Sequence, residues 1–290
     1  MYKIIADSSC DLTSLEHLNT NALYGRAPLR ILVGDTEYVD EPGLDTRAMM
    51  DAVYAFKGKT GSACPSPEEY AEHCRQVDEA YIVTISSNLS GSYNSAAQAA
   101  REFMQTHPGR KAYIFDTLSA GPEQAMLVDE LTRLIAQGHD FDTVVEMGNR
   151  YLSGTHILFC LESMNNLARN GRVSPAAAKI ASVLGIRAVG DAEGGQIIPV
   201  HKPRGHRKAI ATLVQMMEER GLKEDGYVRI AHCFGQQQAE DLKAATLAKH
   251  PGVRFVIEPT TALCSFYAEV GGLMIGMEGD YNTVNHPDNF

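Results

Sequence analysis

Four serines lie where an apolar run at 81–85 leads into a helical pattern at 92–105: Ser86, Ser87, Ser90 and Ser92. The pattern predicts a strand, a hydroxyl-rich loop and a helix, in that order. The first turn of a helix offers free backbone N–H groups and the positive end of the helix dipole, which together favour an anion. We therefore expect this loop to hold the anionic head group of a ligand.

Two further loops of small polar residues occur at 7–12 and 59–67. In each, a polar side chain could simply cap the helix that follows, Ser9 or Asp11 in the first loop and Ser66 in the second. Ser62 or Ser66 could instead donate a hydrogen bond to a ligand. Because loops that follow the strands of a parallel sheet gather at one edge, where ligands usually bind, we expect all three loops to meet there.

The sequence supports neither a hydrolase elbow at Ser90 nor a P-loop. The elbow G-x-S-x-G around Ser90 would need a glycine at Asn88, and a P-loop ending at 58–60 would need a glycine at Val53. No general base can be assigned to any serine from the sequence. The serines therefore favour binding over catalysis.

Two basic features remain open to more than one interpretation. Arg172 follows Gly171 and precedes Ser174, so it could bond to a helix C-terminus or place a cation near the mouth of a site. The basic run at 201–208 could attract a phosphate-bearing or acidic partner, although a solvated turn explains it as well.

The bulk composition excludes several classes of protein. A formal net charge of −10 argues against a general nucleic-acid surface. The six cysteines are scattered without the spacing of a zinc or redox motif, which predicts reduced thiols in a cytoplasmic protein and no metal. The N-terminus reads as a strand rather than a signal peptide, and no apolar run approaches the ~20 residues that span a bilayer.

Short apolar runs alternate with helical patterns, which is typical of an α/β protein with a largely parallel sheet. We expect a first domain at 1–153. Its predicted strands lie at 3–6, 29–33, 81–85 and 112–115, and its predicted helices at 92–105, 122–137 and 141–152.

We expect a second, smaller α/β domain at 154–290. The glycines of 191–195 predict a turn, so that 187–189 and 196–200 form a hairpin. A helix is predicted at 175–184. Further strands are predicted at 157–161, 228–231, 254–257 and 271–276.

Several segments, in this order, resemble the DegV family of bacterial fatty-acid-binding proteins, whose better-understood members are the acyl-carrying subunit of a fatty acid kinase. Residues 86–93 read SSNLSGSY where the family has S-S-x-L-S-G-T-Y, and residues 62–66 read SACPS where it has T-S-Q-P-S. The other matching segments are 7–12, 116–121, 161–174 and 202–209.

The resemblance implies a two-domain fold with an N-terminal Rossmann-like parallel sheet and a fatty acid in a tunnel between the domains. It places the carboxylate at Ser62, Ser90 and Gly91, and Arg172 at the family's arginine near the opening. It also implies a lipid-binding protein without catalytic residues, a kinase catalytic subunit as partner, and no cofactor other than the bound fatty acid.

Two departures from the family pattern affect the expected site. Ser62 replaces a threonine and keeps the hydroxyl, whereas Ala63 and Cys64 replace serine and glutamine and remove polar groups. Tyr267 stands at the position of the family's histidine. A tyrosine donates a hydrogen bond but is ordinarily neutral, so a charge-dependent step in phosphoryl transfer is in question here.

The leading hypothesis is therefore a carrier that buries a long acyl chain. At about 0.8 kcal/mol per methylene, burial of such a chain contributes on the order of 10 kcal/mol before the costs of association. The main alternative is a hydrolase or acyltransferase with Ser90 as nucleophile, which requires a histidine within reach of Ser90. A structural adaptor with an empty cleft is the third hypothesis.

Overall fold

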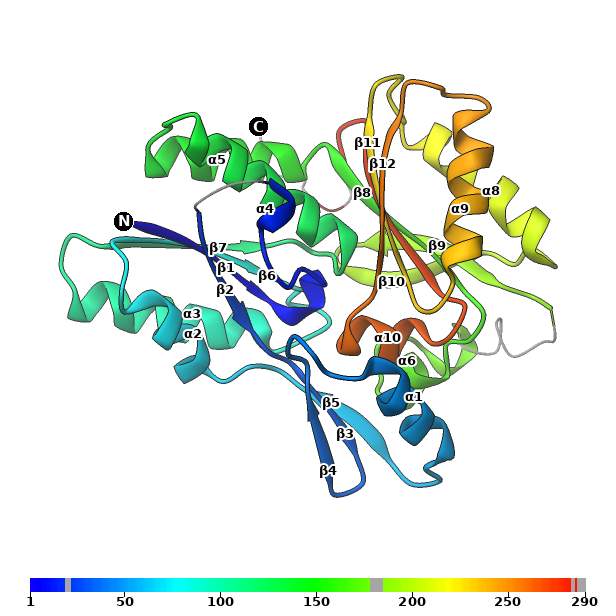
Figure 1. Cartoon of the computed structure of the whole chain (residues 1–290), viewed down its shortest axis with the longest axis horizontal. Helices are drawn as coiled ribbons and strands as arrows, with labels where there is room; N and C mark the ends of the chain where they lie inside the picture. The colour runs from blue at the N-terminus through cyan, green and yellow to red at the C-terminus, as the bar shows by residue number, and fades with distance from the viewer. Residues whose placement is uncertain (19–21, 178–184, 283–284, 286–290) are drawn as a thin grey trace.

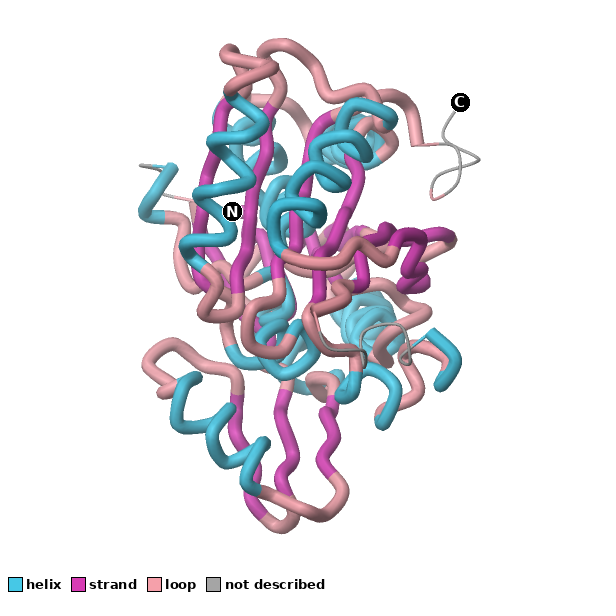
Figure 2. The backbone as a smooth tube through the Cα atoms, turned by 90° about the vertical axis from the view of Figure 1, so that its right-hand side faces the viewer, coloured by secondary structure: helices cyan, strands magenta, loops and turns pink. Residues whose placement is uncertain are grey.

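A computed structural model describes residues 1–18, 22–177, 185–282 and 285. In this part of the chain, the strands form three sheets (Figure 1). Two larger sheets lie in the body of the molecule with helices against them, and a small sheet projects from one end (Figure 2).

The first sheet is parallel, with the order β2-β1-β6-β7. Helices α2 and α3 cover one face, and α4 and α5 cover the other (Figure 1). Because both faces are covered, successive residues of β1 are buried on opposite sides: Ile4 packs against α4 and α5, and Ile5 against α2 and α3. The elements are β1 (Tyr2–Asp7), β2 (Leu23–Ala27), β6 (Glu79–Thr84), β7 (Lys111–Asp116), α2 (Pro67–Cys74), α3 (Ser92–Thr106), α4 (Pro122–Ala136) and α5 (Phe141–Leu152).

The second sheet is mixed, with the order β10-β9-β8-β13-β11-β12. Helices α8 and α9 cover its outer face, and their apolar residues pack with those of the strands in one cluster (Figure 1). The elements are β8 (Thr155–Leu161), β9 (Ala188–Glu193), β10 (Gln196–His201), β11 (Tyr227–His232), β12 (Arg254–Pro259), β13 (Leu273–Glu278), α8 (His206–Glu219) and α9 (Gln236–Leu247).

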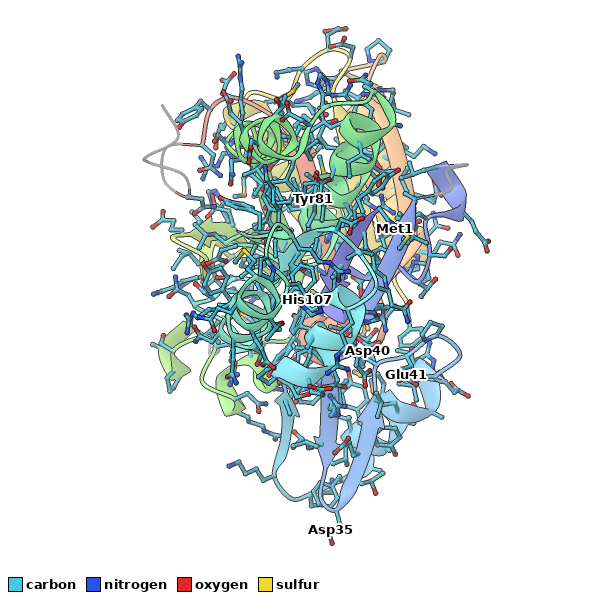
Figure 3. The ribbon with its side chains drawn as sticks, turned by 90° about the vertical axis from the view of Figure 1, so that its left-hand side faces the viewer. Met1, Asp35, Asp40, Glu41, Tyr81 and His107 are labelled. Carbon is cyan, nitrogen blue, oxygen red and sulfur yellow. The ribbon has the colours of Figure 1, made fainter. Side chains whose placement is uncertain are left out.

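The third sheet is antiparallel and consists of β3 (Arg30–Val33), β4 (Thr36–Val39) and β5 (Thr60–Ala63). Asp35 marks its outer tip, and Asp40 lies where it joins the body (Figure 3). Its apolar side chains pack in one cluster with those of α1 (Thr46–Ala55) and α10 (Ala262–Ala268). Helix α6 (Asn165–Arg169) contacts β5. The small sheet of the first half is thereby tied to helices of the second half.

Helix α4 is shared by the two larger sheets, since it contacts β1 and β6 of the first and β8, β11 and β13 of the second. Gly276 on β13 permits this close approach. A Cβ at Gly276 would lie 2.8 Å from Met126 Sδ and 2.9 Å from the Glu123 nitrogen. The helix therefore holds the two halves of the chain against each other.

The predicted helices at 92–105, 122–137 and 141–152 are confirmed, as are the strands of both halves, within a few residues at their ends. The strand at 29–33 forms, but in the antiparallel sheet and not in the parallel one. The parallel edge is taken by β2, whose sequence contains Gly25 and Arg26 and lacks an apolar pattern. Of the predicted helix at 175–184, residues 178–184 lie outside the described part of the chain.

The predicted hairpin is also confirmed, with a shorter turn. Strand β9 continues through Glu193, so that only Gly194 and Gly195 form the turn, with φ of 54° and 73°. The described part of 154–290 holds one sheet of six strands, whereas 1–153 holds the four-stranded and the three-stranded sheets. The domain division between residues 153 and 154 stays a prediction.

The buried carboxyl group of Glu123 gives a test of this packing. It lies at the start of α4 and accepts a 2.6 Å hydrogen bond from Thr155 Oγ1 on β8. Burial raises the pKa of Glu123 to about 7 from its ordinary value of 4.5. Because the pKa is higher in the folded state, the contribution of Glu123 to stability is fully present below pH 4.5 and is lost as the pH rises towards 7.

The quantity to measure is the free energy of unfolding of the wild type minus that of Glu123→Gln, obtained by urea unfolding. We expect this difference to fall by about 3 kcal/mol between pH 4.5 and pH 7. Glu146→Gln, on the exposed side of α5, is the control and should show no such trend. A difference that stays constant with pH would contradict the buried position of Glu123.

Candidate functional site

A cavity of about 350 Å³ lies between the two halves of the chain. The first half contributes β5 and the loops at 85–91 and 118–120, and the second half contributes β8, the β9–β10 hairpin and α10. Most of the lining side chains are aliphatic or aromatic. A cavity of this size and character is typical of a site for a small apolar ligand.

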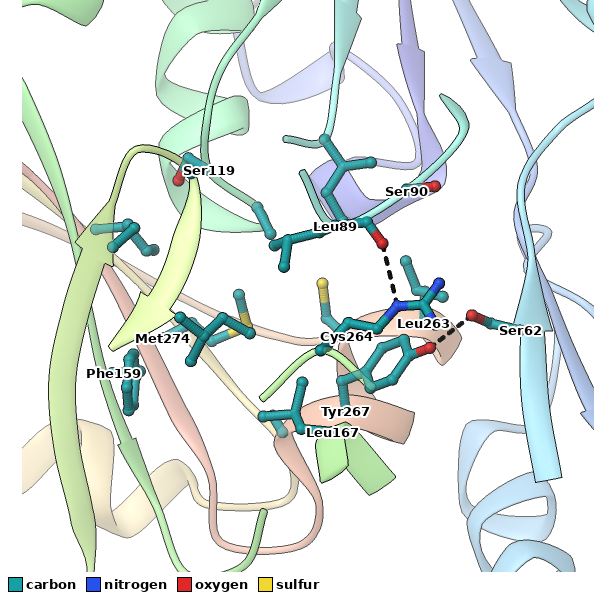
Figure 4. A pocket seen from close by; sticks show the side chains of 18 of the residues that line it. Ser62, Leu89, Ser90, Ser119, Phe159, Leu167, Leu263, Cys264, Tyr267 and Met274 are labelled. Carbon is teal, nitrogen blue, oxygen red and sulfur yellow. Dashed lines mark hydrogen bonds between the residues drawn. The ribbon is translucent and has the colours of Figure 1, made fainter. Parts of the chain in front are cut away.

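Ser62 and Tyr267 lie together at one side of this cavity, with their hydroxyl oxygens 2.7 Å apart (Figure 4). Ser62 is part of β5, where it is paired with Ile31 of β3. The expectation that Ser62 belongs to a loop at the edge of the parallel sheet is therefore wrong. The antiparallel sheet carries it to the same place from another direction.

Buried Asp7 fixes the loop that carries Ser90 and Gly91. Its Oδ2 atom accepts hydrogen bonds from the Ile85 backbone at 2.9 Å and from Ser92 Oγ at 2.6 Å. Burial raises the pKa of Asp7, and these hydrogen bonds oppose that rise. The loop therefore enters α3 in one defined conformation.

Ser90 and Gly91 line the cavity at the start of α3. Ser90 Oγ accepts a hydrogen bond from the Ser92 backbone at 3.3 Å, so its own proton remains available to a ligand. A Cβ at Gly91 would lie 3.1 Å from Cys64 Sγ, which makes this a position of close approach between β5 and α3. The two predicted head-group segments are thus in contact.

Ser86 and Asn88 of this loop bond to the β9–β10 hairpin. Ser86 Oγ donates to the Gly195 carbonyl at 2.8 Å, and Asn88 Nδ2 donates to the Gly194 carbonyl at 2.6 Å. These bonds hold the tip of the β9–β10 hairpin against the first half of the chain. Of the four loop serines, Ser90 alone is among the described lining residues.

Arg172 is the only cationic side chain among the described lining residues of the cavity. Its Nε atom donates to the Leu89 carbonyl at 3.1 Å, and its guanidinium also bonds to the Asn170 carbonyl. No carboxylate of the described residues pairs with it. The bond to Asn170, which ends α6, agrees with the first interpretation. Arg172 also lines the cavity, and its place near the mouth of a binding site stays a prediction.

The helix that carries Tyr267 is anchored by two buried carboxylates of the first half. Asp40 accepts from the backbone nitrogens of Ala262 at 3.0 Å and Leu263 at 3.1 Å, and Asp11 accepts from that of Thr261 at 2.8 Å. Burial raises the pKa of Asp11 to about 7. Asp40 also pairs with Arg26 at 3.1 Å, which compensates its charge.

The described residues give Ser90 no catalytic partner. The Ser92 backbone makes the one hydrogen bond of its hydroxyl, and no histidine occurs among the described residues that line the cavity. The requirement of the hydrolase hypothesis for a histidine near Ser90 is not met in this part of the chain. Among the described residues, no group of three or more His, Cys, Asp or Glu side chains could hold a metal ion.

Two of the capping expectations can be compared with the structure. Ser66 caps α2, with Pro67 following it and Glu69 completing a capping box. The cap expected from Ser9 is wrong, because its hydroxyl is buried between Asp7 and Gln124, at 2.6 Å and 2.5 Å.

Sequence reasoning missed the apolar wall and one polar residue in it. Ile157, Phe159 and Leu161 of β8 face the cavity, but every residue of that strand is buried, so no alternating pattern marks the lining. Asp191 on β9 also lines the cavity. It lay within the segment assigned to a turn.

Comparison with known proteins agrees with this geometry. The family model described as "uncharacterised protein, DegV family" matches residues 1–278. A DegV domain-containing protein of Streptococcus pyogenes serotype M1 is 37% identical over 278 residues, which cover 96% of this chain and 99% of the relative. The chain belongs to the DegV family.

Solved structures of DegV proteins show the same fold. The Fatty Acid Kinase (Fak) B3 protein of Streptococcus pneumoniae, loaded with linoleic acid, has a TM-score of 0.93 and 37% identity, covering 96% of this chain and 99% of its own. A DegV family protein of Eubacterium eligens, loaded with heptadecanoic acid, has a TM-score of 0.92 and 31% identity, with coverage of 97% and 100%.

The hydrogen bond between Ser62 and Tyr267 can be tested in this DegV-family chain by a double-mutant cycle. Tyr267→Phe and Ser62→Ala should each lower the free energy of unfolding by about 1 kcal/mol, since each removes the same bond. The double variant should lose less free energy of unfolding than the two single variants together, as measured by urea unfolding. Tyr38→Phe, in the same apolar cluster, is the control, and strict additivity would contradict the contact.

Proposed function

We propose that this DegV-family protein binds one long-chain fatty acid, with the acyl tail in the cavity and the carboxylate at Ser62, Ser90, Gly91 and Arg172. The observation that carries the proposal is Arg172, a cation without a carboxylate partner among the described residues, at a cavity lined mostly by apolar side chains. A ligand with one negative end and a long apolar body complements both features.

The acyl tail and the carboxylate of such a ligand contribute to binding in different ways. Each methylene removed from water contributes about 0.8 kcal/mol, so the tail supplies most of the affinity. The hydroxyl groups and Arg172 determine which end of the ligand lies at β5 and α3, because a buried carboxylate needs charged or hydrogen-bonding partners. Tyr267 lies beside Ser62 and can also donate to the carboxylate.

The two related structures described above support the proposal, since both contain a fatty acid. They also support a carrier over an enzyme that uses Ser90. The bound acid would serve as ligand, without a further cofactor. A cytoplasmic location stays a prediction; no helix within the described residues has the length and apolar character to cross a bilayer.

A partner kinase is part of the proposal. The Fak B3 relative is named for a fatty acid kinase. If the tail is buried while the carboxylate remains at the polar side of the cavity, a separate catalytic subunit could phosphorylate the carboxylate without moving the lipid into water. This protein would then present the substrate and supply no catalytic residue.

Mass spectrometry of lipid extracted from the purified protein tests the binding proposal. We expect about one fatty acid per chain in the wild type and a marked loss in Ser62→Ala and Ser90→Ala, because each variant removes a donor to the carboxylate. Protein that contains no fatty acid, and takes up none when it is supplied, would contradict the proposal.

Ser66→Ala is the matched control for these variants. Ser66 caps α2 near Ser62 but does not line the cavity, so its replacement should cost about 1 kcal/mol of stability and leave the lipid content unchanged. Lipid loss in Ser66→Ala equal to that in Ser62→Ala would show that instability, and not a missing donor, releases the ligand.

The kinase proposal is tested with loaded protein, ATP and a fatty acid kinase catalytic subunit. Transfer of the γ-phosphoryl group to the carboxylate gives ADP and an acyl phosphate, which hydroxylamine converts to a measurable hydroxamate. We expect hydroxamate only when all three components are present, and a higher yield with Tyr267→His, which introduces a group that can carry a proton. If protein with bound fatty acid yields no hydroxamate, the kinase proposal is overturned and the proposal of fatty acid binding is not.

A further inference from the structure

A patch of exposed side chains lies beside the helix that carries Tyr267. It consists of Arg47 and Tyr54 on α1, Phe234 after β11 and Val270 after α10, and we call it the α1–α10 patch. Tyr54, Phe234 and Val270 are 46%, 37% and 38% exposed. Single exposed apolar residues are ordinary on a protein surface, whereas a cluster of them marks an interaction site.

Contacts join the four residues into one surface. The Arg47 guanidinium lies 3.5 Å from the centre of the Phe234 ring, and the Val270 nitrogen donates a 3.1 Å hydrogen bond to the Tyr54 hydroxyl. Arg47 and Tyr54 are seven residues apart in α1 and therefore lie on the same face of the helix. Burial raises the pKa of Tyr54, and Arg47 is close enough to oppose that rise.

Phe234 holds its exposed ring in a strained backbone conformation. Its φ of 51° lies in the left-handed region, which bulky side chains rarely adopt. Backbone hydrogen bonds of 2.9 Å between Cys233 and residues 271–272 fix this turn beside Val270. Strain at an exposed aromatic residue is not repaid by burial in a core, so it points to a role in binding.

The α1–α10 patch adjoins the head-group side of the cavity. Val270 follows Tyr267 by three residues, and Tyr267 bonds to Ser62. Helix α1 packs beside α10 in this part of the molecule (Figure 1). A kinase that phosphorylates a carboxylate held at Ser62 must cover the surrounding surface, because the γ-phosphoryl group of its ATP has to reach the carboxylate in line.

The chemistry of the patch indicates what kind of surface covers it. Arg47 has no ion pair with a carboxylate of the described residues, so an acidic side chain of a partner would complement it. Tyrosine, phenylalanine and arginine are enriched in protein–protein interfaces. The Tyr54 and Phe234 rings already have fixed neighbours, so their ordering costs little on association.

We propose that the α1–α10 patch docks the catalytic subunit of a fatty acid kinase. Phe234 and Tyr54 form the apolar contact, and an acidic residue of the kinase pairs with Arg47. This inference rests on the proposed kinase partner and assigns the surface to which that partner binds.

Two variants separate the apolar from the charged contribution. Phe234→Asn removes the ring, and asparagine tolerates the left-handed conformation, so the turn is expected to keep its shape. Arg47→Gln removes the charge and keeps most of the stem. The double variant Arg101→Gln/Met104→Ser is the matched control, because it removes an exposed cation and an exposed apolar side chain from the second half of α3.

The experiment measures the rate of hydroxamate formation with the full-length protein, loaded with fatty acid, as the varied substrate of the catalytic subunit. We expect KM to be about tenfold higher in Phe234→Asn, with kcat unchanged, because the bound complex is the same once it has formed. Arg47→Gln should also raise KM. Salt should raise KM in the wild type and much less in Arg47→Gln, since salt screens a charge pair at an interface. The control should keep the wild-type KM.

Three results would overturn the docking proposal while leaving fatty acid binding and phosphorylation intact. The first is the same KM in the wild type and both patch variants. The second is a loss of bound fatty acid in Phe234→Asn, measured by mass spectrometry, because the residue would then act on the cavity. The third is an unchanged KM with loss of self-association or of binding to phosphatidylglycerol vesicles in Phe234→Asn, because the patch would then serve another occupant.

Absence of hydroxamate from loaded wild-type protein has a different meaning. It would overturn the kinase partner itself, and this inference with it. Failure of the surface and failure of the partner are therefore distinguishable in the same assay.

Discussion

The buried carboxyl group of Asp7 is the interaction on which the arrangement of the site depends. It lies at the end of β1 and binds the Ile85 backbone, Ser92 at the start of α3, and Gln124 in α4 at 3.2 Å. One side chain thus joins the first strand, the loop with Ser90 and Gly91, and the helix that contacts both large sheets. Because a buried carboxyl group must keep its donors, none of these segments can move alone.

The cavity therefore forms where the two halves of the chain meet, and neither half forms it alone. Its polar groups come from the small antiparallel sheet, from the loop before α3 and from α10, which Asp40 and Asp11 hold in place across the junction. Between them lies an apolar wall built largely from one fully buried strand, β8.

The parts predictable from sequence were those with local signals. The strand, loop and helix at 81–105 were identified because apolar, hydroxyl-rich and alanine-rich segments succeed one another there. Strand β2 was missed because Gly25 and Arg26 interrupt any apolar pattern, and β5 because its residues are small and polar. Both strands are specified by their pairing partners, which single-sequence reasoning does not contain.

The sequence by itself determined the α/β class, the serine-rich junction at α3 and the residues Ser62, Ser90, Gly91, Arg172 and Tyr267, all of which line one cavity. These depend on local patterns or on ordered motifs. The tertiary structure alone decided that Ser62 reaches Tyr267 from an antiparallel strand and that Ser86 donates a hydrogen bond to Gly195 in the β9–β10 hairpin. Such contacts join residues far apart in the chain, and their geometry follows from packing that no local segment encodes.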